Sequence, residues 1–272
     1  MRGARPERAL DAVIRSAVRF ECGVRVCVAC SGGPDSVALA ALLDRLARED
    51  GYDIVLAHVN HGVRASAAQD ECVVLSVAAR LGRRVVVARP HAAGDDEAGL
   101  RETRYGALAE LADAADATAV ATAHTAEDQT ETVLLALFRG TGVDGLAGMP
   151  PRRPLTERVE LVRPVLRVTH AELATELRRS ALPYALDPTN ERARYRRNAL
   201  RAPLAALREE FPRLDRAVAR CAAIVRGELE RSGRGQARRA LRDELRKRNL
   251  LRDVPFERIE AMLDARERNT HP

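Results

Sequence analysis

Residues 31–36, with the sequence SGGPDS, have the types and spacing of a phosphate-binding loop. They directly follow an apolar run at 24–30 and directly precede a helical pattern that starts at Val37. Gly32 and Gly33 permit positive φ angles and a close backbone approach to a ligand. The N-terminus of the next helix offers N–H groups and a partial positive charge, and Ser31 and Ser36 add hydroxyl donors. The segment therefore predicts a cradle for nucleotide phosphates.

The loop differs from a Walker A loop because the Gly-Lys-Ser/Thr ending of that motif is missing. Lys247 is the only lysine of the chain, so no lysine side chain reaches over the phosphates at this loop. A short loop that holds phosphates through backbone groups and hydroxyls suits a departing pyrophosphate as well as a γ-phosphate.

Two carboxylates form a second candidate site in the segment 124–132. Asp128 and Glu131 are three residues apart, so on a helix they share one face. Two oxygen donors near a triphosphate can bind Mg²⁺ with the phosphates completing the coordination shell. The alternative is helix capping, with Thr125 as N-cap and Asp128 three residues later. The nearby phosphate loop favours the metal.

The elements that must position these residues alternate between short apolar runs and helical patterns. Strands are predicted at 24–30, 54–59, 84–88, 118–123 and 161–165, and helices at 37–48, 67–81, 99–115 and 126–138. This order predicts an α/β fold with a Rossmann-like parallel sheet and helices on both faces. Ligands of such sheets bind at the carboxyl ends of the strands. The loops 31–36, 60–64 and 124–128 all lie there, so we expect them to converge on one crevice.

The later part of the chain predicts two different kinds of structure. Glycine and proline are too frequent at 140–154 for regular structure. From 214 to 251 the pattern is helical and rich in arginine, with a break near 232–235. We therefore predict a catalytic domain at 1–212 and a basic helical extension at 213–272. One apolar stripe should pack inward, with the arginines facing outward as a candidate surface for nucleic-acid phosphates. The stripe is Leu214, Val218, Cys221, Val225 and Leu229.

Composition narrows the class of protein. The 46% hydrophobic content is ample for a core, whereas the absence of Trp and the 3% aromatic content argue against a stacking platform for single strands. The net charge of +6 comes from 45 Lys and Arg residues against 39 Asp and Glu. Arginine suits phosphate contacts, although a compositional bias toward Arg and Ala explains the same count. Five cysteines, no secretory signal and no membrane-length apolar run predict a cytoplasmic protein with no membrane contact.

Several further segments occur in a specific order. They are HVNHGVR at 58–64, HTAEDQTET at 124–132, RGTGVDGLAGM at 139–149, RPVL at 163–166, DPTN at 187–190 and YRRNALR at 195–201. With the phosphate loop, this ordered set resembles the tRNA(Ile)-lysidine synthetase family of ATP pyrophosphatases. Thr125 stands where that family usually has a second His, and Glu127 where it usually has the first Asp. Longer members carry C-terminal domains, so the end at Pro272 predicts a short form.

The resemblance implies an ATP-dependent ligase that joins free L-lysine to the wobble cytidine of tRNA(Ile) with a CAU anticodon. It implies Mg²⁺ as a cofactor, with Asp35 and Asp128 as metal ligands, and a possible homodimer. It implies ATP binding by Ser31, Gly32, Gly33, Pro34, Asp35, Ser36, His58 and His124. The implied catalytic residues are Asp35, Asp128, Glu131, Arg197 and Arg201. The implied tRNA-binding residues are Arg101, Arg104, Arg139, Arg197 and Arg201.

Three other functions compete with this interpretation. A tRNA-thiolating enzyme of the same fold needs reactive cysteines; Cys27 and Cys30 have CxxC spacing, but in a strand that spacing places them on opposite faces. An ammonia-dependent ligase such as an NAD or GMP synthetase does not fit the segments at 139–149 and 195–201. A non-catalytic RNA-binding relative does not fit the intact carboxylates Asp35, Asp128 and Glu131.

Overall fold

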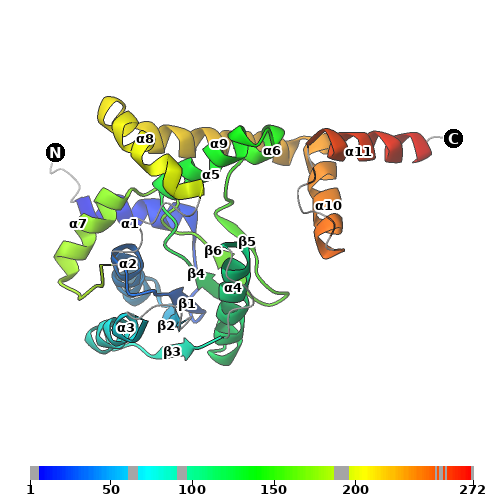
Figure 1. The fold of residues 1–272 in the computed structure, drawn as a ribbon. Coiled ribbons are helices and arrows are strands. Elements are labelled where there is room, and N and C mark those ends of the chain that lie inside the picture. The colour runs from blue at the N-terminus through cyan, green and yellow to red at the C-terminus, as the bar shows by residue number, and fades with distance from the viewer. Residues whose placement is uncertain are drawn as a thin grey trace. The chain divides into compact units, whose positions relative to one another are not determined.

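The structure is a computed structural model that describes residues 6–60, 67–90, 97–186, 196–248, 250, 254 and 256–270 (Figure 1). The strands are β1 (Arg25–Ala29), β2 (Asp53–Val59), β3 (Val85–Ala88), β4 (Ala119–Ala121), β5 (Arg152–Pro154) and β6 (Glu160–Val162). The helices are α1 (Pro6–Ala17), α2 (Pro34–Asp50), α3 (Ala67–Leu81), α4 (Glu97–Ala114), α5 (Ala126–Phe138), α6 (Gly142–Leu146), α7 (His170–Ser180), α8 (Arg196–Glu210), α9 (Leu214–Arg231), α10 (Gly233–Lys247) and α11 (Phe256–Thr270).

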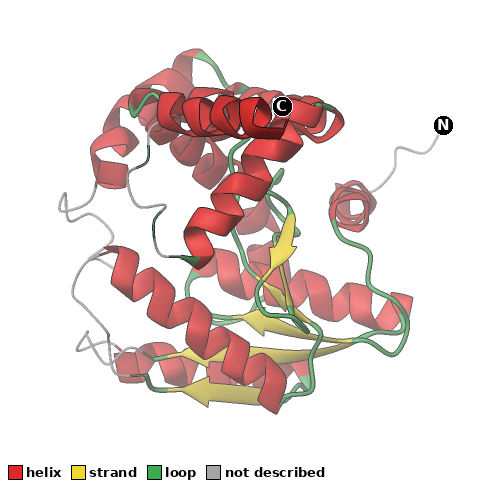
Figure 2. Ribbon diagram, turned by 90° about the vertical axis from the view of Figure 1, so that its right-hand side faces the viewer, coloured by secondary structure: helices red, strands yellow, loops and turns green. Residues whose placement is uncertain are grey.

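The strands form a six-stranded sheet in the order β3-β2-β1-β4-β6-β5 (Figure 2). All neighbouring pairs are parallel except β5 and β6, which are antiparallel. The five predicted strands are present, and the parallel α/β sheet is confirmed. The order places β1 at the centre, so the phosphate loop that follows it leaves the sheet between β2 and β4.

Helices cover both faces of this sheet because the side chains of its strands alternate between two apolar clusters. Val26 and Val28 of β1 pack in one cluster with α1, α2, α3 and α7. Cys27 packs in the other cluster with α4. In Figure 1, α2 and α3 lie on one side of β1 and β2, and α4 lies on the other. The predicted two-faced arrangement is therefore confirmed.

The chain divides into two compact units that are not continuous in sequence. We call Met1–Glu127 with Pro151–Leu204 the sheet unit, and Asp128–Pro150 with Ala205–Pro272 the helical unit. The second unit thus takes a segment from the middle of the chain as well as its end. The predicted boundary at residue 212, between a catalytic domain and a basic helical extension, stays a prediction.

The segment 140–154 is more regular than its glycine and proline content indicated. It contains α6 and β5. In the helical unit, Asp144 of α6 forms ion pairs with Arg238 at 3.3 Å and Arg242 at 3.5 Å. Arg226 donates to the backbone oxygens of Ala147 and Met149. Hydrogen bonds from Arg226 and ion pairs from α10 thus hold this segment in place, so tertiary contacts stabilise it.

The arginine-rich end of the chain does form helices with a break at Ser232, which caps α10. Its packing agrees with the prediction only in part. Of the predicted stripe on α9, Leu229 is buried and Cys221 is exposed, and the remaining three residues are half-buried. The other buried residues of α9 are Asp215, Ala219 and Ala222. Many of the arginines also form ion pairs with acids of the same unit; examples are Arg208–Asp215, Arg231–Glu228, Arg234–Glu260, Arg239–Glu230 and Arg246–Asp243. Much of this region's positive charge is therefore balanced internally.

Candidate active site

The phosphate loop is held in shape by its own hydroxyl groups. Ser36 Oγ donates to the Gly33 backbone oxygen at 2.8 Å, and the Ser31 N–H donates to Ser36 Oγ at 3.2 Å. Gly33 is the N-cap of α2, with Pro34 in the first turn, where its missing N–H costs no hydrogen bond. The loop therefore runs straight into a helix N-terminus, whose first N–H groups have no partner inside the helix.

Gly32 is the position in this loop that requires glycine. Its φ of +88° lies in the left-handed region, and an added Cβ would lie 3.1 Å from the Asp70 backbone oxygen of α3. Its own backbone oxygen accepts from the Ala185 N–H at 2.8 Å. The loop is thus supported by α3 and by the chain that follows α7.

A cavity of about 330 Å³ opens beside the loop. Ser31, Gly33, Pro34, Asp35 and Ser36 form its polar wall. Its remaining lining comes from the strand ends and from α4; the residues are Ala29, Cys30, Ala57, Val59, Arg104, Leu108, Thr122, Ala123 and His124. A cavity with a phosphate-binding wall and an apolar wall matches the two chemical halves of a nucleotide.

Two predicted histidines lie at the strand ends beside this loop. His124 lines the cavity, and its Nδ1 is 2.9 Å from Thr122 Oγ1. His58 is buried, and its Nδ1 is 2.8 Å from the Cys30 backbone oxygen, so this nitrogen carries the proton. Its Nε2 is buried and has no hydrogen-bond partner among the described residues. His58 therefore supports the strand that leads into the loop, whereas His124 faces the cavity.

An arginine cluster that sequence reasoning found only in part surrounds the ring of Tyr105 in α4. Arg101, Arg104 and Arg153 lie over this ring at 5.1, 5.5 and 4.9 Å from its centroid. Burial would raise the pKa of the Tyr105 hydroxyl, but the charges of Arg101, Arg104 and Arg163 outweigh burial and lower that pKa. Arg163 is itself fully buried. The RETRY segment indicated the first two arginines, but Arg153 and Arg163 come from β5 and just after β6.

The two predicted carboxylates lie on α5, whose observed bounds equal the predicted ones. Asp128 and Glu131 both belong to the helical unit, whereas Asp35 belongs to the sheet unit. Glu131 is buried, and Thr132 donates to the Asp128 backbone oxygen at 2.8 Å. The shared metal site of Asp35 and Asp128 stays a prediction, as does the capping alternative.

The remaining predicted residues are placed less fully. Arg139, just after α5, and Arg201, on α8, are exposed. Arg197 lies on α8, but its side chain is outside the described residues, as are most of the loop 60–64 and the segment 187–195. Their predicted roles stay predictions.

The start of α7 meets the phosphate loop through His170. The His170 Nδ1 lies 3.0 Å from Asp35 Oδ2, and its Nε2 lies 3.4 Å from Thr125 Oγ1. The His170 N–H donates to Glu127 Oε1 at 3.0 Å. Three segments of the sheet unit therefore meet at one imidazole.

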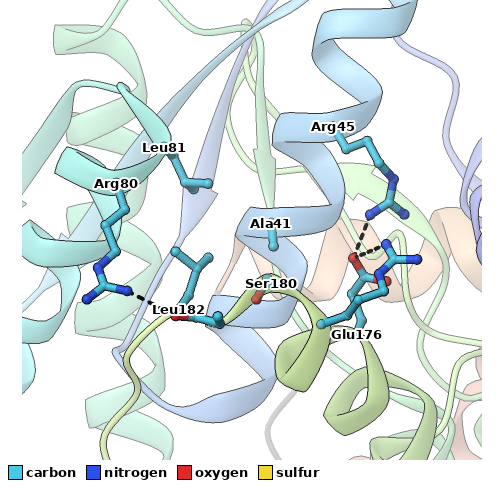
Figure 3. Close-up of a pocket in the computed structure, with 9 residues that line it drawn as sticks. Ala41, Arg45, Arg80, Leu81, Glu176, Ser180 and Leu182 are labelled. Carbon is cyan, nitrogen blue, oxygen red and sulfur yellow. Dashed lines mark hydrogen bonds and ion pairs between the residues drawn. The ribbon is translucent and has the colours of Figure 1, made fainter.

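A second cavity, of about 310 Å³, lies between α2, the end of α3 and α7 (Figure 3). Glu176 of α7 accepts from Arg45 of α2 and from Arg179, and Arg45 also pairs with Asp11 of α1. Arg80 donates to the Ala181 backbone oxygen at 3.0 Å. These contacts fix α7 against α2, at the opposite end of α2 from the phosphate loop.

The cysteines near the loop are buried structural residues. Cys27 and Cys30 pack in different core clusters, which confirms that they lie on opposite faces of the sheet. Burial raises the pKa of the Cys27 thiol to about 11 and also raises that of Cys30. Across the described residues, no group of three or more His, Cys, Asp or Glu side chains could hold a metal ion. These two cysteines therefore lack the shared face that a common cluster or thiol relay requires.

Comparisons with known proteins agree with this geometry. A family model described as a PP-loop domain matches residues 6–207. A tRNA(Ile)-lysidine synthase of Nostoc sp. is 36% identical over 219 residues, which are 80% of this chain and 64% of the relative. A tRNA(Ile)-lysidine synthase of Ralstonia nicotianae is 43% identical over 205 residues, or 73% of this chain and 44% of the relative. The chain therefore spans about half to two thirds of the length of these relatives.

Among solved structures, a U34-tRNA thiolase from Methanococcus maripaludis, described with its [4Fe-4S] cluster, has a similar fold. The TM-score is 0.67 at 14% identity, over 79% of this chain and 76% of that one. At this identity the likeness concerns the fold alone. Within the described part of the chain, no helix has the length and apolar character needed to cross a membrane.

Proposed function

The chain belongs to the PP-loop domain family, and from its similarity to curated lysidine synthases we propose that it forms lysidine on an isoleucine tRNA with a CAU anticodon. In the first step, the carbonyl oxygen between the two ring nitrogens of the wobble cytidine attacks the α-phosphorus of ATP, and pyrophosphate leaves. In the second step, the side-chain amine of free lysine attacks the ring carbon that carries this oxygen, loses a proton and displaces AMP. The observation that carries the proposal is the identity with curated lysidine synthases over most of the chain.

The cavity beside the phosphate loop supports ATP as the nucleotide. Its polar wall would hold the pyrophosphate through Ser31, Gly33 and Ser36, and its apolar wall, with Leu108, would take the base. Transfer of an adenylyl group depends mainly on positioning and charge neutralisation, which fixed backbone groups and hydroxyls provide. His124 lines the same cavity and would contact the nucleotide.

Carboxylates would provide the negative charge that Mg²⁺ and the lysine ammonium group need. Asp35 lines the cavity, and its oxygens are the ligand type that Mg²⁺ prefers. Mg²⁺ would neutralise phosphate charge when bound, with most of its shell supplied by phosphate and water. Asp128 and Glu131, which share one face of α5, would serve the metal and the lysine ammonium group.

Arginines are the proposed contacts for tRNA and ATP phosphates. The cluster on Tyr105 brings four guanidinium groups together, and Arg104 also lines the nucleotide cavity. Arg139, Arg197 and Arg201 complete the proposed tRNA set. A homodimer and a cytoplasmic location remain part of the proposal.

On the helical extension, ion pairing with acids leaves fewer arginines as candidate contacts for tRNA. Arg213 and Arg220 are exposed and have no ion pair among the described residues, in contrast to Arg231 and Arg239. Arg213 is the N-cap of α9 and Arg220 lies seven residues later on that helix, so the two are separated by about 10 Å along the helix axis. This spacing allows both guanidinium groups to contact one phosphate backbone.

The test is to incubate the protein with an isoleucine tRNA transcript, ATP and isotopically labelled lysine, and to analyse the nucleosides by mass spectrometry. We expect labelled lysine on one cytidine. Pyrophosphate should form once tRNA and ATP are present, whereas AMP should be released only when lysine is present as well. A methionine tRNA with the same anticodon letters is the control substrate. Replacement of a tRNA oxygen by sulfur, or release of AMP without lysine, would reject the proposal in favour of a thiolase or another ligase.

A further inference from the structure

Two residues at which this chain departs from the family pattern contact the same residue, His170. Thr125 replaces the usual second His, and its Oγ1 lies 3.4 Å from His170 Nε2. Glu127 replaces the usual first Asp, and its Oε1 accepts from the His170 N–H at 3.0 Å. His170 comes from α7, more than forty residues later in the chain, as the sequence separation of 43 from Glu127 shows. The two substitutions are therefore linked in space by one residue, Thr125 through the His170 ring and Glu127 through the His170 backbone N–H.

The other nitrogen of this ring contacts the phosphate loop, where His170 Nδ1 lies 3.0 Å from Asp35 Oδ2. The ring thus connects Asp35 to the position where the pattern has a histidine. We propose that His170 is a positioning residue that fixes the Asp35 carboxylate in the cavity, and that it supplies from α7 the imidazole that position 125 has lost. The proposal rests on the proposed function for its catalytic consequence and on these contacts for its geometry.

The surroundings of His170 restrict its movement. Thr169 and Glu172 form a capping box at the start of α7, which sets the direction of the helix. Glu176 is held by Arg45 of α2 (Figure 3), so α7 is attached to α2 at its first residue and again at its middle. A ring that is fixed by its backbone and by two side-chain contacts can hold a carboxylate in one rotamer.

Stability alone does not explain this arrangement. The His170 and Asp35 side chains are 49% and 32% exposed, and a pair this exposed contributes little to the stability of the fold. Orientation of a reacting group has a far larger effect on rate, because misplacement by about 1 Å can cost about a hundredfold. A positioning role therefore predicts a loss of turnover with little loss of stability.

The experiment compares His170→Ala with the double variant Thr125→His, His170→Ala, which moves the imidazole to position 125. Arg178→Ala, an exposed change on the same helix, is the matched control. We expect kcat to fall at least tenfold in His170→Ala, with the KM for ATP changed less than threefold and the urea midpoint unchanged. The double variant should recover at least a third of the lost turnover, and His170→Gln, which keeps a donor, should retain part of it.

Equal kcat values for His170→Ala and the wild type would overturn the positioning role, and failure of the double variant to recover turnover would overturn the relocation. A second readout does not depend on turnover. In protein labelled with ¹⁵N-histidine, the His170 ring signal, identified by its loss in His170→Ala, should shift in Asp35→Ala. An unmoved signal would reject the contact. Absence of lysidine formation by the wild type would reject the proposed function and leave this second readout to decide the inference.

Discussion

Replacing Gly32 by Ala tests whether the phosphate loop depends on one glycine, and Gly23 offers a matched control. Both residues have positive φ angles, +88° for Gly32 and +80° for Gly23. An added Cβ at Gly23 meets nothing within 4 Å, whereas at Gly32 it would lie 3.1 Å from the Asp70 backbone oxygen. The two variants thus share the backbone strain and differ in the contact.

The strain term is similar at both sites. A left-handed conformation costs an Ala about 1–2 kcal/mol, and the loss of unfolded-chain freedom returns about 0.4–1 kcal/mol. Gly23→Ala should therefore destabilise by about 1 kcal/mol. Crowding against a backbone oxygen that cannot rotate away adds about 1–3 kcal/mol at Gly32. Because this residue belongs to the loop itself, Gly32→Ala should also weaken ATP binding at least tenfold.

Urea unfolding followed by tyrosine fluorescence measures this difference. The chain has no Trp, and its four tyrosines all fall within the residue ranges of the sheet unit, so the signal reports on that unit. Titration calorimetry gives the ATP affinity of each variant. Equal stability losses in the two variants, together with equal ATP affinities, would refute the argument that Gly32 is required by its surroundings.

Two further predictions follow from the burial and ion pairs described above. Iodoacetamide at pH 8 should not modify Cys27 or Cys30 in the native protein, because their raised pKa values keep both thiols protonated. Labelling should begin only after unfolding or, for Cys27, as the pH approaches about 11. Peptide mass mapping measures this labelling, and rapid labelling at pH 8 would contradict the burial of the two thiols. Changing both Arg213 and Arg220 to Ser should reduce the slope of log affinity for tRNA against log salt concentration by about 0.7–0.9 per arginine. Arg231→Ser, which removes an ion-paired arginine, should change this slope less. Identical slopes for all variants would place the tRNA phosphates elsewhere.

Local patterns predicted the elements well where hydrophobic periodicity decides the structure. The bounds of α3 and α5 equal the predicted 67–81 and 126–138. β5 was missed because its three residues, Arg-Arg-Pro, have no apolar alternation, and its pairing with β6 alone makes it a strand. On α9 the buried stripe runs through Ala219 and Ala222, since small residues allow close packing that aliphatic spacing does not reveal.

The candidate site was predictable in its loops but not in its long-range partners. The phosphate loop and His124 follow from strand–loop–helix order, and both line the cavity. Arg153 and His170 could not be found this way, because each reaches the site from an element far along the chain. Only the folded arrangement shows that a tyrosine ring collects arginines and that an imidazole from α7 contacts Asp35.

The interleaved units impose an order on folding during synthesis. The backbone oxygen of Met149 accepts its hydrogen bond from Arg226, which is synthesised 77 residues later. At about 5–20 residues per second, this delay is roughly 4–15 s. The middle segment of the helical unit therefore emerges long before the helices that cover it, and the sheet unit must tolerate this exposed insertion while its own chain is completed. Nascent chains halted between these two points should be the most sensitive to protease and the strongest clients of ribosome-bound chaperones.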